Sequence, residues 1–278
     1  MDLEGRTALL TGASGGIGAH LADGLGREGV RLALSGRNVD VLERVADRVR
    51  AAGGEAAVVP ADLTDLAAAD ALTSRAEAAV GPLDILVNNA GVESPAAYTD
   101  LPVTEIERYV AVNLTSAMIL IRRAVPGMLA RGRGQVVTVS SIAGKGPIPY
   151  DAPYAATKAG LIGLMRSLRV EYADTPVGFS VVCPGFVEGE GMYGRMVEQG
   201  FRSPSILGSS PPGKVVDAVI DAITRDRAET IVNPRPLRLL FALDELVPGT
   251  GERLVTAIGT RRMFAGLARR RQSGDPGT

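Results

Sequence analysis

Short runs of β-branched and other apolar residues alternate along the chain with longer, alanine-rich segments of helical periodicity. This alternation is typical of βαβ units, in which helices cover both faces of a parallel sheet. The pattern predicts strands at Thr7–Thr11, Arg31–Ser35, Ala56–Pro60, Ile85–Asn88, Gln135–Ser140, Phe179–Cys183 and Glu229–Val232. It predicts helices at Gly16–Glu28, Val39–Ala52, Asp65–Val80, Thr104–Arg131, Pro153–Tyr172 and Gly213–Thr224. The expected fold class is therefore α/β, with a doubly wound parallel sheet of seven strands.

No linker rich in Pro, Gly or Ser divides the chain before Glu188, and no repeat of fixed period occurs. Residues 1–233 are therefore expected to form one nucleotide-binding and catalytic domain. Within it, Gly, Ser and Pro gather over residues 188–212 around a short apolar piece. This composition predicts a mobile loop or lid that determines the shape of the substrate site, and its small or apolar side chains favour a hydrophobic substrate.

Residues 234–278 are expected to form a C-terminal helical extension. The amphipathic stretch 237–247 predicts a helix that packs on its own domain or on another subunit. Two alternatives stay open: the extension covers the substrate crevice, or its arginine-rich tail touches acidic membrane lipid. The arginines of that tail are Arg253, Arg261, Arg262, Arg269, Arg270 and Arg271.

Composition narrows the class of protein. Of 278 residues, 46% are hydrophobic and 22% charged, which supplies a substantial core and excludes disorder. The 30 basic and 31 acidic residues give a net charge of −1, which disfavours nucleic-acid binding. Cys183 is the single cysteine of the chain and His20 its single histidine. We therefore expect no disulfide within the chain and no bound metal. The acidic start and the lack of any apolar run of ~18 residues predict a cytoplasmic protein.

A glycine-rich segment, Thr11–Gly18, lies between the first predicted strand and the first predicted helix. Glycines let the backbone turn tightly and approach a pyrophosphate, whose charge is favoured by the free N–H groups and the dipole of the helix. The context indicates a dinucleotide site in a Rossmann-like fold. The residues expected to contact the cofactor there are Gly12, Ser14, Gly15, Gly16, Ile17 and Gly18.

The end of the second predicted strand indicates which dinucleotide binds. An acidic side chain there accepts hydrogen bonds from the adenosine ribose of NAD, whereas an arginine attracts the 2′-phosphate of NADP. This chain has Gly36 in the expected place and Arg37 after it. The sequence therefore predicts NADP(H), favoured over NAD(H).

Tyr154 and Lys158 are four residues apart on a predicted helix, hence on one face. Lys158 is one of only three lysines in the chain. An ammonium group near a phenol stabilises the phenolate, so we expect Lys158 to move proton transfer by Tyr154 toward neutral pH. Ser141, at the carboxyl end of the fifth strand, is expected to donate a hydrogen bond to the developing oxyanion. These residues predict a carbonyl and alcohol interconversion with Tyr154 as general acid and base.

Further motifs stand at Asp62, Asn88–Gly91, Asn113, Ser140-Ser141, Tyr154–Lys158 and Pro184-Gly185. With Thr11–Gly18, their order and spacing over residues 5–232 resemble the short-chain dehydrogenase/reductase family in its common single-domain form. The 13-residue interval to Tyr154 matches Ser141, rather than Ser140, to the family's serine. The resemblance implies the sheet order 3-2-1-4-5-6-7 and a homodimer or homotetramer.

The resemblance also implies roles for individual residues. Lys158 would hydrogen-bond the nicotinamide ribose, and Asn113 would hold a water that connects Lys158 to solvent. The catalytic set is then Asn113, Ser141, Tyr154 and Lys158. The remaining cofactor contacts are Asp62, Leu63, Asn89, Ala90, Gly91, Pro184, Gly185 and Val187, with Tyr154 and Lys158.

Two departures from the family pattern concern the cofactor and the end of the chain. Gly189 stands where the family often has a threonine that helps to hold the nicotinamide amide or a phosphate, which puts cofactor affinity in doubt more than activity. The family's frequent Gly-Gly ending after the last strand is replaced by residues 233–236 and the extension.

Three functions are compatible with these residues. The first is an NADP(H)-dependent oxidoreductase that interconverts a ketone or aldehyde and an alcohol on a hydrophobic small molecule. The second is a 3-ketoacyl thioester reductase, which uses the same chemistry on a carrier-bound substrate. The third is a non-catalytic, redox-sensing module that keeps only the nucleotide site, against which the intact Ser141, Tyr154 and Lys158 argue.

Overall fold

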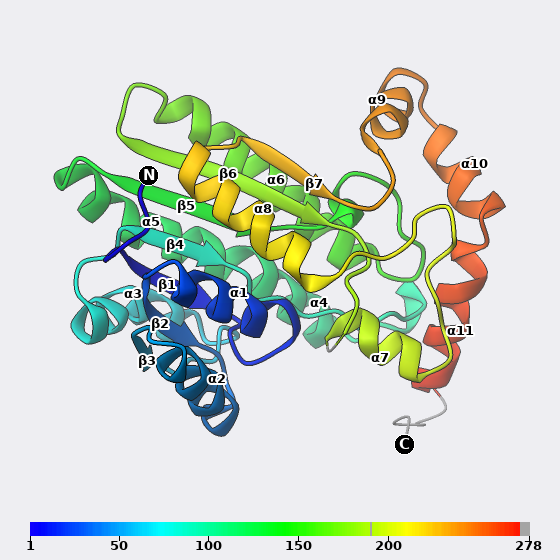
Figure 1. Ribbon diagram of the computed structural model, residues 1–278. Helices are drawn as coiled ribbons and strands as arrows, with labels where there is room; N and C mark the ends of the chain where they lie inside the picture. The colour runs from blue at the N-terminus through cyan, green and yellow to red at the C-terminus, as the bar shows by residue number, and fades with distance from the viewer. Residues whose placement is uncertain (190, 273–278) are drawn as a thin grey trace.

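A parallel sheet lies at the centre of the computed structural model, which describes residues 1–189 and 191–272 and the side chains of 1–189 and 191–270 (Figure 1). Seven strands are hydrogen-bonded in the order β3-β2-β1-β4-β5-β6-β7, which confirms the expected Rossmann-like fold and strand order. The strands are β1 (Thr7–Thr11), β2 (Arg31–Ser35), β3 (Ala56–Val58), β4 (Ile85–Asn88), β5 (Gly134–Val139), β6 (Val177–Pro184) and β7 (Glu229–Val232).

The strand order places a crevice at the carboxyl ends of β1 and β4. From β1 the chain builds outward through β2 to β3, then returns across the sheet to β4 on the other side of β1. The loops after β1 and β4 therefore diverge to opposite faces, and ligands of open α/β sheets bind at such a point.

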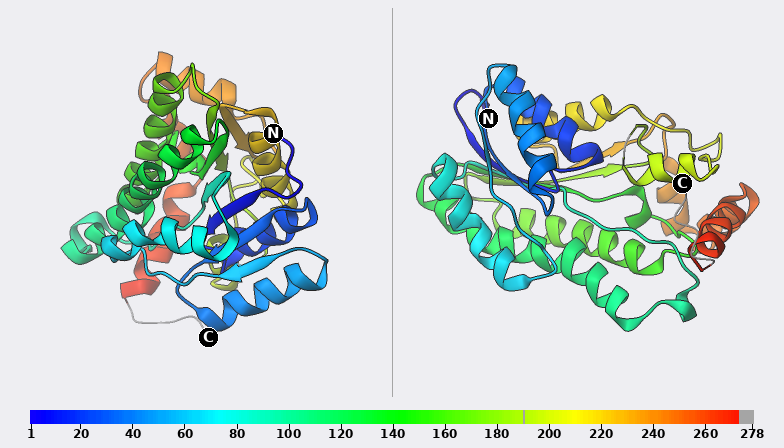
Figure 2. Two further views of the ribbon diagram at one scale, coloured as in Figure 1. Left: turned by 90° about the vertical axis from the view of Figure 1, so that its left-hand side faces the viewer. Right: turned by 90° about the horizontal axis from the view of Figure 1, so that it is seen from below.

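Helices cover both faces of this sheet. Leu10 packs into the apolar layer under one set of helices, and its neighbour Leu9 packs into the layer under the other. Because both faces are buried, the central strands read as continuous apolar runs rather than as alternating ones. Figure 2 (right) shows the two sets on opposite sides of the sheet. They are α1 (Gly16–Arg27), α2 (Val39–Ala51) and α8 (Pro212–Arg225), and α3 (Leu66–Val80), α5 (Ser116–Ala130) and α6 (Ala152–Glu171).

The long helix expected at Thr104–Arg131 is interrupted. It consists of α4 (Val103–Val110), a π-helical segment η2 (Ala111–Thr115) and α5. Within the wider turn, Ser116 Oγ donates to the carbonyl oxygen of Val112 at 2.8 Å, and the side chain of Asn113 reaches out of the helix. Single π turns inside α-helices are frequent at functional sites. The apolar periodicity of residues 104–131 is almost unchanged across the π-helical segment, so the sequence did not reveal the interruption.

The segment 188–212, expected as an irregular loop, contains the helix α7 (Met192–Glu198). Residue 190 lies outside the described residues. The segment is tied back to the domain where Val187 and Ser210 form a parallel bridge. The periodicity did not reveal α7 because the helix is short and follows Gly191, whose φ is +124°.

Three helices form the C-terminal extension: α9 (Arg238–Leu246), α10 (Thr250–Ala257) and α11 (Thr260–Gln272) (Figure 1). Phe264 and Leu267 of α11 are buried in a cluster with Met196 of α7. The extension thus packs against the segment after β6, while residues 273–278 of the expected tail lie outside the described part. None of the described helices is long and apolar enough to span a membrane.

Candidate active site

The loop between β1 and α1 fits a phosphate group. Gly12 has a φ of +65°, and a Cβ atom there would lie 2.8 Å from the Cα atom of Ala90. A Cβ atom on Gly18 would lie 2.0 Å from the carbonyl oxygen of Gly12, whereas one on Gly15 would meet open space. Gly15 caps α1 without a side-chain hydrogen bond, so no side chain takes the place that an anion would fill. The residues present therefore fit the pyrophosphate of a dinucleotide.

Hydrogen bonds fasten this loop to the loop after β4. Thr11 Oγ1 accepts from the backbone N–H groups of Asn89 and Ala90, each at 3.1 Å. The Asn89 amide donates in return to the carbonyl oxygens of Thr11 at 3.0 Å and Gly12 at 3.2 Å. The two loops that diverge from the sheet are thus held as one rigid wall of the crevice.

Arg37 lines the cavity at the end of β2, beside the glycine-rich loop. A Cβ atom on Gly36 would lie 2.7 Å from Ser14 Oγ, so the end of β2 comes close to the glycine-rich loop. The hydrogen bond from the Thr64 N–H, and to a smaller extent the charges of Arg37 and Arg108, lower the pKa of Asp62. Arg108, on α4, is a cation that sequence reasoning missed. Arg108 forms an ion pair with Glu105 at 3.0 Å, so the cation that makes this end of the crevice attractive to an anion is mainly Arg37.

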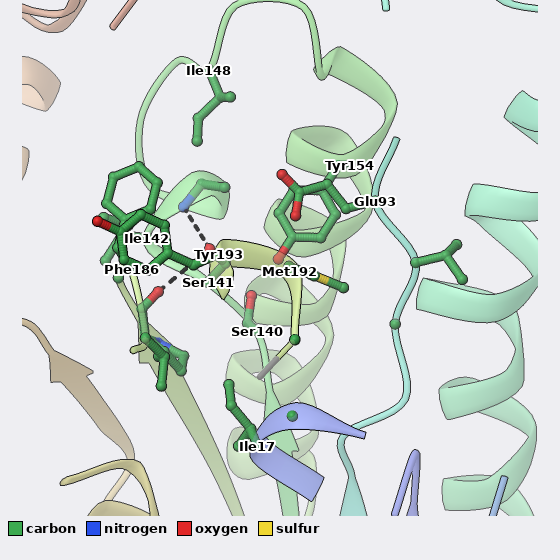
Figure 3. Close-up of a pocket in the computed structure, with 18 of the residues that line it drawn as sticks. Ile17, Glu93, Ser140, Ser141, Ile142, Ile148, Tyr154, Phe186, Met192 and Tyr193 are labelled. Carbon is green, nitrogen blue, oxygen red and sulfur yellow. Dashed lines mark hydrogen bonds between the residues drawn. The ribbon is translucent and has the colours of Figure 1, made fainter. Parts of the chain in front are cut away.

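Tyr154 and Ser141 lie near one another where β5 meets α6 (Figure 3), and Lys158 follows Tyr154 by one turn of α6. Tyr154 lies in the first turn of α6, and the Ser141 hydroxyl group, which donates to the carbonyl oxygen of Pro184 at 3.4 Å, lies near its phenol. Ser141 Oγ accepts from the N–H of Ala143 at 3.1 Å, which fixes its rotamer. Lys158 Nζ lies 5.5 Å from the centre of the Tyr154 ring and donates to the carbonyl oxygen of Val139 at 3.0 Å.

The electrostatics of this group differ from the expectation that Lys158 lowers the pKa of Tyr154. Burial of the phenol raises its pKa, and the charge of Glu93 raises it further, against the opposing effect of the nearby Ser141 hydroxyl group. Burial also lowers the pKa of Lys158 to about 8. For both Tyr154 and Lys158, the largest contribution to the pKa shift is thus the free-energy cost of moving the charged form out of water. At neutral pH the phenol keeps its proton and can act as an acid.

Asn113 lies in the π-helical segment and is buried. Its Oδ1 atom accepts from the N–H of Val92 at 2.7 Å, and its Nδ2 atom donates to the carbonyl oxygen of Val92 at 3.0 Å and to Thr157 Oγ1 at 3.2 Å. The side chain thus joins the loop after β4 to α6. This contact keeps Gly91 and Val92 next to Lys158.

One cavity of about 670 Å³ connects these parts. Ser141 and Tyr154 lie on its wall, whereas Lys158 and Asn113 lie behind Gly91: a Cβ atom there would be 3.4 Å from Lys158 Nζ and 3.6 Å from Asn113 Oδ1. The cavity brings together all the other residues expected to contact a cofactor. They are Gly12, Ser14, Gly15, Gly16, Ile17, Gly18, Arg37, Asp62, Leu63, Asn89, Ala90, Gly91, Pro184, Gly185 and Val187.

Beyond Tyr154 the cavity continues into an apolar chamber. Part of its wall comes from the loop before α6 and from α7, and part comes from the C-terminal extension. The apolar residues that line it are Ile148, Phe186, Met192, Met196, Leu207, Leu237, Leu240, Phe241, Leu254, Val255, Ile258 and Phe264. The sequence identified the 188–212 segment as a wall of this site, but it left the place of the extension open among several alternatives.

Sequence reasoning missed a group of polar residues beside Tyr154. Glu93 and Arg195 lie on the cavity wall, and the carboxyl group of Asp151 lies close enough to Glu93 to act on its pKa. Glu93 comes two residues after Gly91, and Asp151 comes three before Tyr154. Acidic residues so close to two expected site motifs were the signal that could have found them.

Comparisons with known proteins agree with this architecture. The short chain dehydrogenase family model matches residues 6–199. Ketoacyl reductase HetN of Nostoc sp. is 36% identical over 262 residues, which are 92% of this chain and 90% of that protein. Oxidoreductase UcpA of Salmonella typhimurium is 36% identical over 186 residues, 66% of this chain and 70% of that protein.

A solved structure with the same fold is that of an actinorhodin polyketide ketoreductase variant with NADPH. It has a TM-score of 0.76 and 30% identity, over 82% of this chain and 95% of that one. The family match over most of the catalytic region and the relative matched over nearly its whole length lead to one conclusion: the chain is an oxidoreductase that belongs to the short-chain dehydrogenase/reductase family.

Proposed function

We propose that the protein is an NADP(H)-dependent oxidoreductase that interconverts a ketone or aldehyde and an alcohol on a hydrophobic small molecule. The observation that carries the proposal is the position of Tyr154 and Ser141. They lie on the wall of one cavity, between a glycine-rich anion site and an apolar chamber. Such an arrangement brings a reduced nicotinamide and a carbonyl group to the same acid.

A reduced nicotinamide, held by the glycine-rich loop and the loops after β4 and β6, would supply the hydride in reduction. Tyr154 gives its proton to the carbonyl oxygen, and its raised pKa means that the proton is present at neutral pH. Ser141 donates a hydrogen bond to the same oxygen as negative charge develops on it. The ammonium group of Lys158 offsets the charge left on Tyr154, and Asn113 holds the water that returns a proton to Lys158. In oxidation the same groups act in reverse.

NADP(H) is proposed over NAD(H) because Arg37 follows Gly36 where an acid would contact the ribose hydroxyls of NAD. The charge of Arg108 adds to that of Arg37 near Asp62. The related ketoreductase structure contains NADPH, which supports the choice. We further propose that residues 1–233 form the catalytic domain and that the extension covers its substrate chamber.

The decisive experiment compares wild type with Tyr154→Phe. Turnover with NADPH is measured over aldehydes, cyclic ketones and long-chain ketones, and NADPH binding is measured by its fluorescence. The variant is expected to bind NADPH as wild type does and to lose at least ~10²-fold in rate, since it lacks the general acid. Equal turnover by the two proteins would refute the proposal.

A 3-ketoacyl thioester reductase is the second candidate. It is favoured by the relative named ketoacyl reductase, which matches this chain over 92% of its length. Activity on acetoacetyl thioesters, compared with that on free ketones of equal size, separates the two candidates.

We also propose a homodimer or homotetramer in the cytoplasm. Large apolar side chains on α4, α5 and α6 are exposed, including Val103, Val110, Met118 and Val170. Exposed apolar patches on a folded domain indicate contact surfaces. Light scattering after size exclusion gives the mass of the assembly.

A further inference from the structure

The helix α9 has two apolar faces. Leu240 and Phe241 lie on the inner face and line the chamber. Leu239, Leu243 and Leu246 follow the spacing i, i+4 and i+7, so they lie together on another face of the helix. Leu239 and Leu246 are each 81% exposed, and Leu243 is 47% exposed. The chamber accounts for the inner face, whereas no described part of the chain covers the outer one.

The outer face of α9 is a patch rather than a scatter of single side chains. Exposed apolar residues that stand alone are normal on a protein surface. Here three leucines share one face of a nine-residue helix, and the exposed Val247 follows directly. Contiguous apolar patches of this kind mark a surface that contacts a partner or a lipid bilayer.

The extension that carries this patch is basic. The whole chain has a net charge of −1, but residues 234–270 contain seven arginines and three acidic residues, which gives that segment a net charge of +4. One of the acidic residues, Asp244, accepts a hydrogen bond from the N–H of Gly251 at 2.6 Å. All seven arginines are exposed; they are Arg235, Arg238, Arg253, Arg261, Arg262, Arg269 and Arg270.

The patch and the arginines belong to one outer wall. The helices α9, α10 and α11 follow one another along one edge of the molecule (Figure 1). Each lines the chamber from its inner side, α9 through Phe241, α10 through Val255 and α11 through Phe264. Because the inner sides share one cavity, the outer sides face away from it together. On α11, Arg262 and Arg269 are seven residues apart and lie on the side opposite Phe264.

The charge of this wall favours a lipid surface over a second copy of the chain. A symmetric dimer formed through the wall would bring two positively charged surfaces together, which costs free energy. Anionic lipid headgroups attract the same arginines, and the region below the headgroups accepts leucine side chains. The chamber behind α9 is itself apolar, and apolar molecules of the kind that it would hold concentrate in a bilayer.

We propose that the outer face of α9 and the exposed arginines of the extension dock on the surface of a membrane that contains anionic lipid. Leu239, Leu243 and Leu246 insert at the boundary between headgroups and acyl chains, and the arginines contact lipid phosphates. The contact places the wall of the chamber against the bilayer. This inference goes beyond the proposed function and does not depend on it.

Sedimentation of the full chain with lipid vesicles tests the apolar part of the surface. The vesicles contain phosphatidylcholine alone or with about one third phosphatidylglycerol. Wild type is expected to bind the anionic vesicles at least ~10-fold more tightly, and to dissociate as the salt concentration rises from about 0.05 to 0.5 M. Leu239→Ser combined with Leu246→Ser should weaken this binding at least ~10-fold. The matched control combines Val39→Ser and Leu66→Ser, which alter exposed side chains on α2 and α3, and should bind as wild type does.

A second pair of variants tests the charge. Arg261→Gln combined with Arg262→Gln is expected to weaken binding to the anionic vesicles about 10-fold and to leave binding to neutral vesicles unchanged. Arg27→Gln combined with Arg44→Gln removes the same charge from α1 and α2 and is the control. If the leucine variant does not fold, judged by circular dichroism, the arginine pair and its control decide.

Three outcomes would overturn the proposal. The first is no binding of wild type to anionic vesicles at low salt. The second is equal binding by wild type and the folded leucine or arginine variant. The third is a lower mass of the leucine variant without lipid, measured by light scattering after size exclusion, which would assign the face to a second copy of the chain. None of these measurements requires turnover, so each outcome leaves the proposed oxidoreductase activity intact.

Discussion

The two ends of the cavity are built in different ways. At the cofactor end, the residues lie in short loops directly after β1, β2 and β4, where the strand order forces them together. At the substrate end, the wall combines the loop before α6 with α7 and three helices near the end of the chain, so residues as distant as Ile148 and Phe264 share one chamber. Residues that are close in the sequence thus determine the chemistry of the site. Packing between distant segments determines which substrate can reach it.

We expect the largest effect from a substitution of Lys158, which lies behind Gly91, near the point where the two ends of the cavity meet. Lys158→Met is expected to lower the reduction rate by about 10³-fold, the range of a lost acid–base partner. Lys214→Met, which alters an exposed side chain on α8, is the control and should leave the rate unchanged. Steady-state kinetics with NADPH measure both.

The burial of Lys158 also predicts how the reduction rate depends on pH. Burial lowers the pKa of Lys158 to about 8, so its ammonium form dominates below that pH and is lost as the pH rises through it. Reduction needs this charge to offset the phenolate that Tyr154 becomes. The rate in wild type is therefore expected to fall as the pH rises through about 8. A flat profile from pH 7 to 9 would show that the charge of Lys158 is not needed.

At the cofactor end, Arg37→Ala is expected to cost about 10- to 100-fold in kcat/KM for NADPH, because a charge-assisted contact to the 2′-phosphate is lost. The value for NADH should change little, since NADH lacks that phosphate. Arg44→Ala removes another exposed arginine, on α2, and should affect neither cofactor. Equal losses for NADPH and NADH would count against the proposed preference.

At the substrate end, Phe241→Ala enlarges the chamber without touching the cofactor. The KM of a long-chain ketone is expected to rise about tenfold, whereas the Kd of NADPH stays the same, because losing the contact with a partly buried aromatic ring costs about 1.5 kcal/mol. Leu239→Ala on the same helix is the control, since that side chain is 81% exposed. A change in NADPH binding would show that the two ends are not independent.

The smallest effect is expected at His20, the single histidine of the chain. It is exposed on α1, and we expect His20→Gln to leave turnover and its pH profile unchanged within error. A lower turnover of this variant would instead place the imidazole in the proton path.

Particular elements show how far the sequence could be taken. The bounds of β1, β2, β4 and β7 were predicted to the residue. The first three are buried strands of a parallel sheet, which are nearly continuous apolar runs, whereas β7 is a half-buried strand at the edge. The π-helical segment and α7 were not, since a single wide turn leaves the apolar period almost unchanged and a seven-residue helix offers too few repeats. The sign of the pKa shift of Tyr154 was wrong because the expectation considered Lys158 alone and not the burial of the phenol.

The sequence by itself determined the doubly wound sheet, the glycine-rich loop and the four-residue interval between Tyr154 and Lys158, because these depend on contacts between near neighbours and on the fixed topology of βαβ units. Only the tertiary structure decided that α9 to α11 wall the chamber and that Glu93 and Asp151 come together beside Tyr154. It also decided the burial of Tyr154, which raises the pKa of the phenol. Cavity shape and desolvation depend on which distant segments exclude water from a site, and no local pattern carries that information.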